Sequence, residues 1–307
     1  MLDFAGRVAI VTGAGRGMGR THALSLASRG ARVVVNDISG DHAADVVREI
    51  EAAGGIAVAD SNNVVGGSDA IVRAALAAFG RLDILVNNAG ILGAKAFEDQ
   101  SAAEWWGVFE IHVRGTVDLC RAAWPHLKAS GAGRIVNISS SGSWGNGGLS
   151  AYGTAKAAIF GFTRSAAIEG GPVGINVNCI LPSAWTAMTA EIDDPAIRKT
   201  LIAHFQPEHT SALVTWLAHQ DTQATCQAIE VGGGRAALIQ PGMAPSIKAP
   251  ESTPEGWAAC ADDLLAGGEL TPVLSTAAMF ERELLLVDPE LKHAMSAAGG
   301  GLALQDV

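Results

Sequence analysis

An apolar run that leads directly into a glycine-rich turn constrains this chain most. Residues 7–12 (RVAIVT) are apolar enough for a strand buried on both faces, and a helical pattern follows the turn as far as Ala31. The turn carries Gly13, Arg16, Gly17, Met18 and Gly19. Backbone N–H groups of such a turn can approach a pyrophosphate, and the following helix N-terminus favours negative charge. The pattern therefore predicts a phosphate-binding loop, with a plain strand-to-helix connection as the alternative.

The alternation of strand and helix continues along most of the chain. Further strands are expected at residues 32–36, 56–59, 82–86, 134–138, 174–180 and 227–231, with helices near residues 41–53, 68–79 and 211–217. Short connections between such elements are typical of parallel sheets with right-handed crossovers. The predicted fold class is α/β, a doubly wound parallel sheet of the Rossmann type with about seven strands and a C-terminal helical extension.

Composition excludes several classes of partner. The 307 residues are 49% hydrophobic and carry a net charge of −10, so a core is expected, whereas nucleic acid and anionic membranes, which need clustered Lys and Arg, are not. No apolar run reaches the length of about 18 residues that a membrane span requires. Asp3 and a strand-like run leave no room for a targeting leader at Met1, and the four cysteines are widely separated. We expect a cytoplasmic protein with reduced thiols and no metal site.

Polar residues at the ends of two early strands indicate which dinucleotide binds. Asp37 ends the second strand, where a carboxylate accepts hydrogen bonds from the ribose of NAD and repels the 2′-phosphate of NADP. Arg16 could meet a phosphate, but we give the carboxylate more weight; an N-cap is the alternative role for Asp37. Asn62 follows the third strand, where its side chain could reach the adenine.

A phenol and an ammonium are paired later in the chain. Tyr152 and Lys156 lie four residues apart in a helix-forming run, so they share one helix face. An ammonium near a phenol stabilises the phenolate, and we expect it to lower the tyrosine pKa toward the working pH of a general acid/base. In isolation, such a pair is more often a chance occurrence on a solvated face.

Three motifs together resemble the short-chain dehydrogenase/reductase family. They are the glycine-rich turn after Thr12, the segment Asn87-Asn88-Ala89-Gly90 and the pair Tyr152 and Lys156, in the family's order and spacing. The resemblance covers residues 7–234 and implies an NAD-dependent oxidoreductase. The cofactor-binding residues that we predict are Gly13, Arg16, Gly17, Met18, Gly19, Asp37, Ile38, Asn62, Asn63, Val64, Asn88, Ala89, Gly90, Ile138, Tyr152, Lys156, Pro182, Ser183 and Thr186.

The resemblance also implies a catalytic set of tyrosine, lysine, serine and asparagine. Tyr152 would be the acid/base, and Lys156 would lower its pKa and hold the nicotinamide ribose. Counting forward along the fifth strand selects Ser140 as the serine, whereas counting back from the tyrosine by the family's usual spacing selects Ser139. The two counts differ by one residue. We favour Ser140 because a loop tolerates a one-residue deletion, whereas a deletion within a strand would turn its side chains to the other face. His112 stands where most of the family has the asparagine, and a proton relay through it is as plausible as a structural role. Ser183 replaces a usual glycine.

Four shorter stretches resemble the 3-hydroxyacyl-CoA dehydrogenase domain of multifunctional enzyme type 2. They are residues 112–116, 121–124, 144–148 and 167–170. A 3-hydroxyacyl-CoA, a steroid or a terpenoid alcohol is the expected kind of substrate, that is, a hydrophobic secondary alcohol or ketone. The apolar segment 181–205 would form a lid, with a packed helix as the alternative; its few cations, Arg198 and Lys199, weaken the CoA assignment.

The resemblance fades beyond Gly234, which gives two predicted regions. Residues 1–238 would form the catalytic domain, and residues 239–307 an extension made of a proline-rich linker and two helical stretches. The extension is too small for a convincing independent domain, so we expect it to pack on its own or a neighbouring subunit beside the substrate cleft. The resemblance to the family also implies that the protein is a homodimer or a homotetramer. A dinucleotide-sensing protein without turnover is the competing function.

Overall fold

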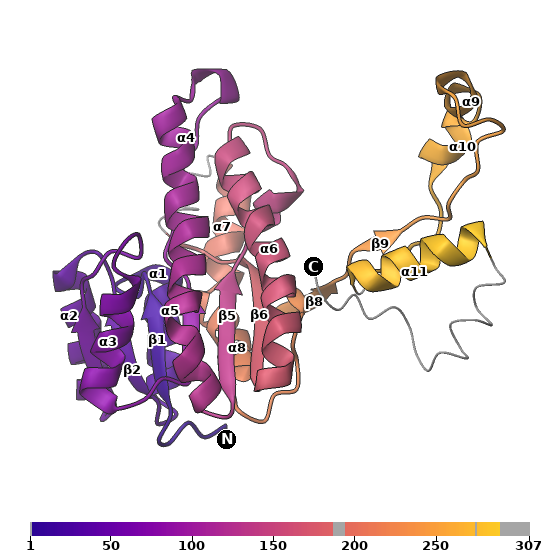
Figure 1. Ribbon diagram of the computed structural model, residues 1–307. Helices are drawn as coiled ribbons and strands as arrows, with labels where there is room; N and C mark the ends of the chain where they lie inside the picture. The colour runs from indigo at the N-terminus through magenta and orange to yellow at the C-terminus, as the bar shows by residue number, and fades with distance from the viewer. Residues whose placement is uncertain (1, 187–193, 274, 289–307) are drawn as a thin grey trace. The chain divides into compact units, whose positions relative to one another are not determined.

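The computed structural model describes residues 2–186, 194–273 and 275–288. Within these ranges, eight strands form one sheet in the order β3-β2-β1-β4-β5-β6-β7-β8 (Figure 1). The strands are β1 (Val8–Thr12), β2 (Arg32–Asn36), β3 (Ile56–Asp60), β4 (Ile84–Asn87), β5 (Gly133–Ile138), β6 (Ile175–Ser183), β7 (Ala228–Gly232) and β8 (Arg235–Ile239). All pairs from β3 to β7 are parallel, as the alternating pattern predicted.

The strand β8 adds one strand to the predicted sheet. It follows β7 after Gly233 and Gly234, whose φ angles are +57° and +72°. Two consecutive positive φ angles are typical of the tight turns that join hairpin strands. The chain therefore reverses direction at the sheet edge after β7, and the added strand β8 ends at Ile239, where the predicted linker begins.

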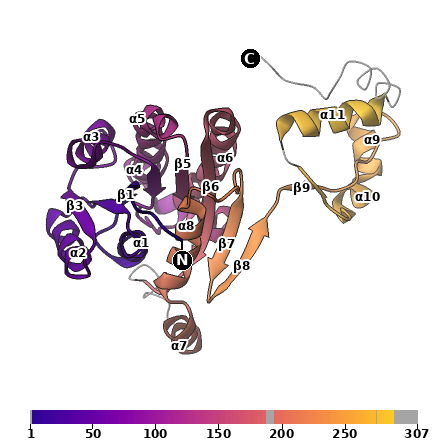
Figure 2. The ribbon, with the colours of Figure 1, turned by 90° about the horizontal axis from the view of Figure 1, so that it is seen from below.

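Helices cover both faces of the sheet (Figure 2). The face that carries α3 (Ser68–Phe79), α5 (Gly115–Ala129) and α6 (Ser150–Gly170) lies opposite the face that carries α1 (Gly17–Ala27), α2 (Gly40–Ala52) and α8 (Pro207–Ala218). The helix α4 (Ala102–Phe109) joins α5 through a π-helical segment, Glu110–Arg114. The short helical segments Phe97–Asp99, Ser141–Trp144 and Gly171–Val173 and the outer helix α7 (Pro195–His204) complete this part of the chain.

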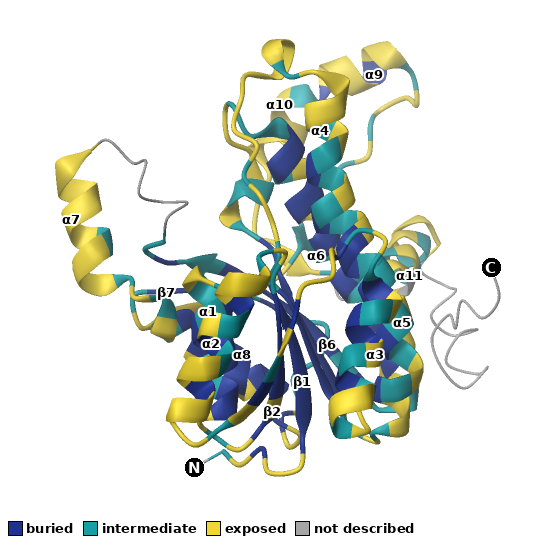
Figure 3. Cartoon of the chain, turned by 90° about the vertical axis from the view of Figure 1, so that its left-hand side faces the viewer, coloured by how far each residue is buried: buried dark blue, intermediate teal, exposed yellow. Residues whose placement is uncertain are grey.

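Two hydrophobic clusters, one on each face, explain why the strands are apolar throughout. Successive side chains of a strand point to opposite faces. Ala9 and Val11 of β1 pack with Leu26 of α1, whereas Val8 and Ile10 pack with helices of the other face. All five residues of β1 are buried, and Figure 3 shows burial concentrated in the strands and in the inner sides of the helices. None of the helices in the described residues is long and apolar enough to cross a membrane.

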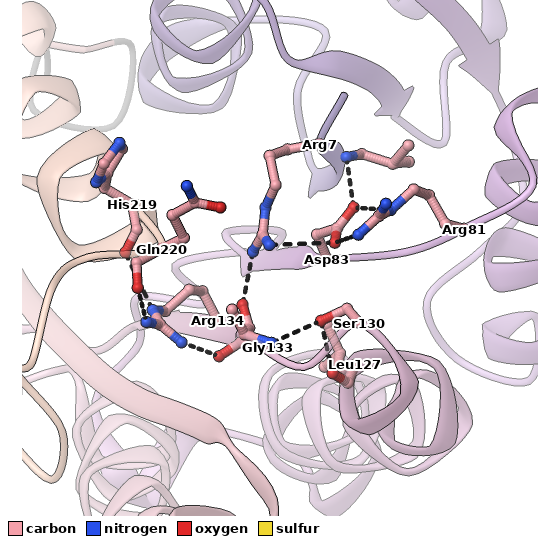
Figure 4. Close-up of polar contacts among 11 residues, drawn as sticks. Arg7, Arg81, Asp83, Leu127, Ser130, Gly133, Arg134, His219 and Gln220 are labelled. Carbon is pink, nitrogen blue, oxygen red and sulfur yellow. Dashed lines mark hydrogen bonds and ion pairs between the residues drawn. The ribbon is translucent and has the colours of Figure 1, made fainter. Parts of the chain in front are cut away.

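A cluster of charged residues lies at the amino-terminal ends of the central strands (Figure 4). Asp83, fully buried before β4, pairs with Arg7 at 3.3 Å and with Arg81 at 2.6 Å, and it accepts a hydrogen bond from the Val8 N–H. Arg134 of β5 donates instead to backbone carbonyls, including that of His219 at 3.1 Å. Burial lowers the pKa of Arg7 and of Arg134. These contacts tie β1, β4 and β5 together at the edge opposite the glycine-rich turn.

The chain divides into two units, Met1–Leu238 and Ile239–Val307. In the second unit, β9 (Gly242–Met243) pairs antiparallel with β10 (Thr271–Pro272). The helices α9 (Pro254–Ala259), α10 (Ala261–Ala266) and α11 (Thr276–Val287) make up the rest of its regular structure. Arg282 of α11 donates to the Ala244 carbonyl, which holds this helix beside the β9 strand. The predicted linker thus contains a short strand.

Candidate active site

The glycine-rich turn lies where the strand order reverses, between β1 and β4. The backbone is close enough there that a Cβ atom on Gly13, whose φ is +60°, would lie 2.9 Å from the Ala89 Cα atom. A Cβ on Gly19 would lie 2.1 Å from the Gly13 carbonyl oxygen. Larger residues cannot occupy these positions. The helix α1 begins at Gly17, so its N-terminus faces the loop, and in open α/β sheets this crevice binds dinucleotides.

Asn88, a predicted cofactor-binding residue at the end of β4, makes hydrogen bonds to the glycine-rich turn. Its side-chain amide donates to the carbonyl oxygens of Thr12 at 2.9 Å and Gly13 at 3.1 Å. The Thr12 hydroxyl in turn accepts from the N–H groups of Asn88 and Ala89, both at 3.0 Å. Thr12 was not singled out from the sequence, although a polar residue at the end of an apolar strand is a usable signal.

The Asp37 carboxylate is held at the end of β2. One oxygen accepts from the Gly15 N–H and the other from the Ser39 N–H, each at 3.0 Å. Ser39, not Asp37, is the N-cap of α2, which removes the alternative role considered for this residue. The adjacent Ile38 is 70% exposed, and Arg16 is also exposed. The carboxylate and an exposed apolar side chain therefore lie together beside the loop.

The predicted adenine-side residues follow β3. Asn62 and Asn63 are exposed, whereas Val64 is buried in the cluster that covers the α3 face. The Asn63 side chain accepts from the Val65 N–H at 2.9 Å and shapes the turn that precedes α3. Of these three residues, Asn62 and Asn63 thus remain accessible to a ligand.

The two candidate serines have different surroundings. Ser139 is buried, and its hydroxyl donates to the Lys156 carbonyl oxygen at 2.8 Å. The Ser140 hydroxyl accepts from the Gly142 N–H at 3.0 Å and hydrogen-bonds to the Tyr152 side chain. The structure therefore brings Ser140, and not the side chain of Ser139, to the tyrosine. A Cβ on Gly142 would lie 3.2 Å from the Tyr152 ring, so the bare backbone at this position also shapes the site.

The ionisation of Tyr152 differs from the sequence prediction. Burial of the phenol raises its pKa, and the hydrogen bond with Ser140 acts in the opposite direction. The expected lowering by Lys156 was wrong for the protein alone. The Lys156 Nζ atom lies 5.6 Å from the centre of the tyrosine ring and donates to the Ile138 carbonyl at 2.6 Å. Burial lowers the pKa of the lysine itself to about 7, which weakens its effect as a cation.

His112 lies against the tyrosine, on the π-helical segment between α4 and α5. The two rings meet edge to face with centroids 5.4 Å apart. Burial, helped by the Lys156 charge, lowers the histidine pKa to about 3, so the imidazole is neutral at physiological pH. The Ile91 carbonyl lies 2.7 Å and the Ile91 N–H 3.1 Å from Nε2, whereas the buried Nδ1 atom has no partner among the described residues.

The lid region is only partly described. Pro182 and Ser183 end β6, and Thr186 lies near Gly17, whose added Cβ would be 4.0 Å from the threonine methyl group. Met188 and Ile192, two of the apolar residues of the predicted lid, lie outside the described residues. Arg198 and Lys199 are exposed on α7, a helix that shows no buried residue.

A buried polar row beneath the site was missed from the sequence. Asn87, Asn137 and Cys179 occupy one level of β4, β5 and β6. The Asn87 amide donates to Asn137 at 2.8 Å, the Asn137 amide donates to the Thr163 hydroxyl at 2.9 Å, and Thr163 hydrogen-bonds to Cys179. The sequence presents Asn137, Thr163 and Cys179 only as single positions in apolar segments, and the pairing of strands brings them into one row with Asn87 of the Asn-Asn-Ala-Gly segment.

The doubly wound sheet carries a glycine cradle, an acidic strand end and a group made of the half-buried Ser140 and the buried Tyr152 and Lys156. In open α/β sheets, dinucleotides bind at this place in the fold. A family model described as short chain dehydrogenase matches residues 7–196. The chain belongs to the short-chain dehydrogenase/reductase family of oxidoreductases, whose members typically use NAD(P).

Among curated relatives, peroxisomal multifunctional enzyme A of Dictyostelium discoideum is 40% identical over 83% of this chain and 59% of its own length. Peroxisomal multifunctional enzyme type 2 of Mus musculus is 42% identical over 76% of this chain and 32% of its own length. The chain therefore spans only part of these relatives, and the match bears out the resemblance to the dehydrogenase domain of the type 2 enzymes.

Solved structures show the same fold. A short chain dehydrogenase from Mycobacterium avium is 38% identical, with a TM-score of 0.77, over 88% of this chain and 98% of its own. A 7α-hydroxysteroid dehydrogenase complexed with NADH and 7-oxo glycochenodeoxycholic acid is 32% identical, with a TM-score of 0.71, over 76% of this chain and 95% of its own.

Proposed function

We propose that the protein transfers hydride between NAD and a hydrophobic secondary alcohol or ketone, with Tyr152 as the acid/base. The observation that carries this proposal is the convergence of Ser140, Tyr152 and Lys156 at the sheet edge that also holds the glycine cradle. A phosphate loop alone would serve a binding protein equally well. A buried phenol paired with a serine hydroxyl is what proton transfer to or from a substrate oxygen requires.

The residues at the cradle fit a dinucleotide. When bound, NAD accepts or supplies the hydride at its nicotinamide. Gly13, Gly17 and the α1 N-terminus would hold the pyrophosphate. The Asp37 oxygens each accept one backbone N–H but retain lone pairs for ribose hydroxyls, and their charge disfavours a 2′-phosphate. We therefore propose NAD over NADP. Ile138, Pro182, Ser183 and Thr186 would line the nicotinamide side.

The raised pKa of Tyr152 makes the phenol a proton donor at neutral pH in the free protein. In that form, Tyr152 gives its proton to the oxygen of a ketone that is being reduced, while the Ser140 hydroxyl holds the same oxygen. Oxidation of the alcohol needs the phenolate, so its kcat/KM should rise with pH, whereas that of reduction should fall. A variation of both rates in the same direction would contradict this assignment.

His112 is proposed as a relay between Tyr152, Lys156 and solvent. Its Nε2 atom can donate to the Ile91 carbonyl or accept from the Ile91 N–H, so either neutral tautomer keeps a backbone partner. Nδ1 can consequently act as an acceptor or as a donor. With its pKa lowered to about 7, Lys156 can both lose and regain a proton near neutrality, which a relay also requires.

The substrate class rests on apolar surroundings and on relatives. Tyr152 belongs to a small cluster with Val108, Ala151 and Ala155. A steroid, a terpenoid alcohol or a 3-hydroxyacyl-CoA therefore remain the proposed candidates, the first supported by the 7-oxo bile acid in the related structure. An assay of NADH formation with all three classes, repeated with NADP, would choose among them.

The replacement Tyr152→Phe separates an enzyme from a dinucleotide sensor, which is the alternative function. We expect NAD binding to persist and kcat/KM to fall by at least about 100-fold, because general acid/base catalysis typically contributes that much. Titration of NAD by calorimetry is the control that the variant is folded. Turnover that survives the replacement would contradict the proposed mechanism, and NAD binding with no turnover of any substrate by the unmodified protein would favour the sensor.

We further propose that residues 239–307 pack on their own or a neighbouring subunit and border the substrate cleft. Deletion of residues 240–307 should then change the oligomeric state, the melting temperature or the activity, and no change in any of them would contradict the proposal.

A homodimer or homotetramer is the proposed oligomeric state, which light scattering would measure. We propose that the protein is located in the cytoplasm. The peroxisome is the competing location, because two of the relatives are named as peroxisomal enzymes. Cell fractionation would distinguish the two locations.

A further inference from the structure

The carboxyl ends of β2 and β3 contain a buried carboxylate, Asp60, that is surrounded by amide donors. The Asn36 side-chain amide donates to Asp60 Oδ2 at 2.6 Å, and the Asn62 backbone N–H donates to the same atom at 3.2 Å. The Asn62 side-chain Nδ2 atom donates to Asp60 Oδ1 at 2.6 Å. Asp60 is 7% exposed, whereas Asn62 is exposed. A covered carboxylate thus holds an exposed amide next to the proposed NAD site.

This contact sets which end of the Asn62 amide faces outward. A carboxylate only accepts hydrogen bonds, so the atom of the amide that touches Asp60 must be the NH2 group. The carbonyl Oδ1 atom is then turned away from Asp60, and no donor among the described residues reaches it. Asn36 reinforces the arrangement because its amide also donates to the Asn62 backbone carbonyl at 2.9 Å. Asn62 therefore offers an acceptor, and not a donor, to a ligand.

We propose that Asp60 is a positioning residue that makes Asn62 selective for a 6-amino purine. With Oδ1 facing outward, Asn62 can accept from the exocyclic amino group of adenine. A purine with a carbonyl at position 6 presents a second acceptor, and its hydrogen bond with Asn62 is lost. This inference deepens the proposed function and rests on it, because it assumes that NAD binds with its adenine beside Asn62.

The test compares the affinities for NAD and for nicotinamide hypoxanthine dinucleotide, which carries a carbonyl in place of the amino group. We expect the unmodified protein to bind NAD about tenfold more tightly, the ratio that one lost hydrogen bond gives when an acceptor is left unpaired. In Asp60→Asn, the new amide can present either its oxygen or its nitrogen to Asn62. The Asn62 amide can then rotate, and the ratio should fall to about twofold.

An exchange of the two side chains supplies the rescue. In Asp60→Asn/Asn62→Asp, a carboxylate faces the adenine and accepts from the amide at position 60, so the ratio should return to about tenfold. Asp69→Asn on α3 is the matched control because it removes a nearby exposed carboxylate without touching Asn62, and it should leave the ratio unchanged. A purely structural role of Asp60 would lower the affinity for both dinucleotides equally.

The outcomes separate this inference from the proposed function. Binding of NAD with an unchanged ratio in a folded Asp60→Asn variant would overturn the role of Asp60 and leave the function standing. Failure of the unmodified protein to bind either dinucleotide would overturn both. Should Asp60→Asn not fold, Asp60→Ser replaces it, since a hydroxyl can also donate and must likewise lower the ratio.

Discussion

Replacing each of the two adjacent serines by alanine should have different consequences for activity and similar, small consequences for stability. Ser140→Ala removes the hydroxyl that hydrogen-bonds to Tyr152. Loss of one preorganised donor to a reacting oxygen typically costs about 100-fold or more in rate, so kcat/KM should fall by about 10². Within the part of the chain that the structure describes, the same hydroxyl accepts one N–H, that of Gly142, and the unfolding free energy should fall by about 1 kcal/mol or less.

Ser139→Ala is the matched control for this prediction. Its hydroxyl is buried and donates to the Lys156 carbonyl, so the loss should appear as about 1 kcal/mol of stability. The kcat/KM value should stay within about threefold, because the Ser139 hydroxyl does not reach the tyrosine. Initial rates of NADH formation and urea unfolding measure both quantities. A variant pair in which Ser139→Ala loses activity and Ser140→Ala keeps it would refute the assignment.

Three further perturbations test the stabilising contacts. Asp83→Asn leaves the Arg7 and Arg81 guanidinium groups without their carboxylate, and urea unfolding should show a loss of about 3 kcal/mol. Thr163→Val removes the acceptor for the buried Asn137 amide, and the loss should be about 1–3 kcal/mol. The pKa values of His22 and His112 are lowered to about 3 by burial, so each unfolded histidine binds a proton that the folded one rejects. Stability should consequently be full above pH 6.5 and fall between pH 6.5 and pH 3, by up to about 1.4 kcal/mol per pH unit for each histidine.

Controls keep these three measurements specific. Asp45→Asn removes an exposed carboxylate and should change stability by less than about 0.5 kcal/mol. Thr154→Val deletes a hydroxyl that bonds only within its own exposed helix turn, so it should cost less than Thr163→Val. His22→Gln should reduce the slope of the acid unfolding curve; an unchanged slope would show that protonation of His22 does not contribute.

The sequence alone determined the fold class and much of the glycine-rich cradle. Apolar runs such as residues 7–12 and the helical periodicity between them depend on local spacing, which is visible in one dimension. Gly13, Gly19 and Asp37 were also recognisable, because a close backbone approach or a strand-end carboxylate restricts the residue type at a single position.

Only the tertiary structure decided how the polar groups pair and ionise. The choice between Ser139 and Ser140 depends on which hydroxyl reaches the Tyr152 phenol and which is taken up by the α6 backbone, and counting residues cannot settle this. The pKa of Tyr152 went up instead of down because burial, a property of the whole packed core, outweighed the hydrogen bond with Ser140. The hydrogen bond of Asn62 to Asp60 is local in the chain, but it is reinforced only because β2 and β3 are paired, which places the Asn36 amide on the same carboxylate.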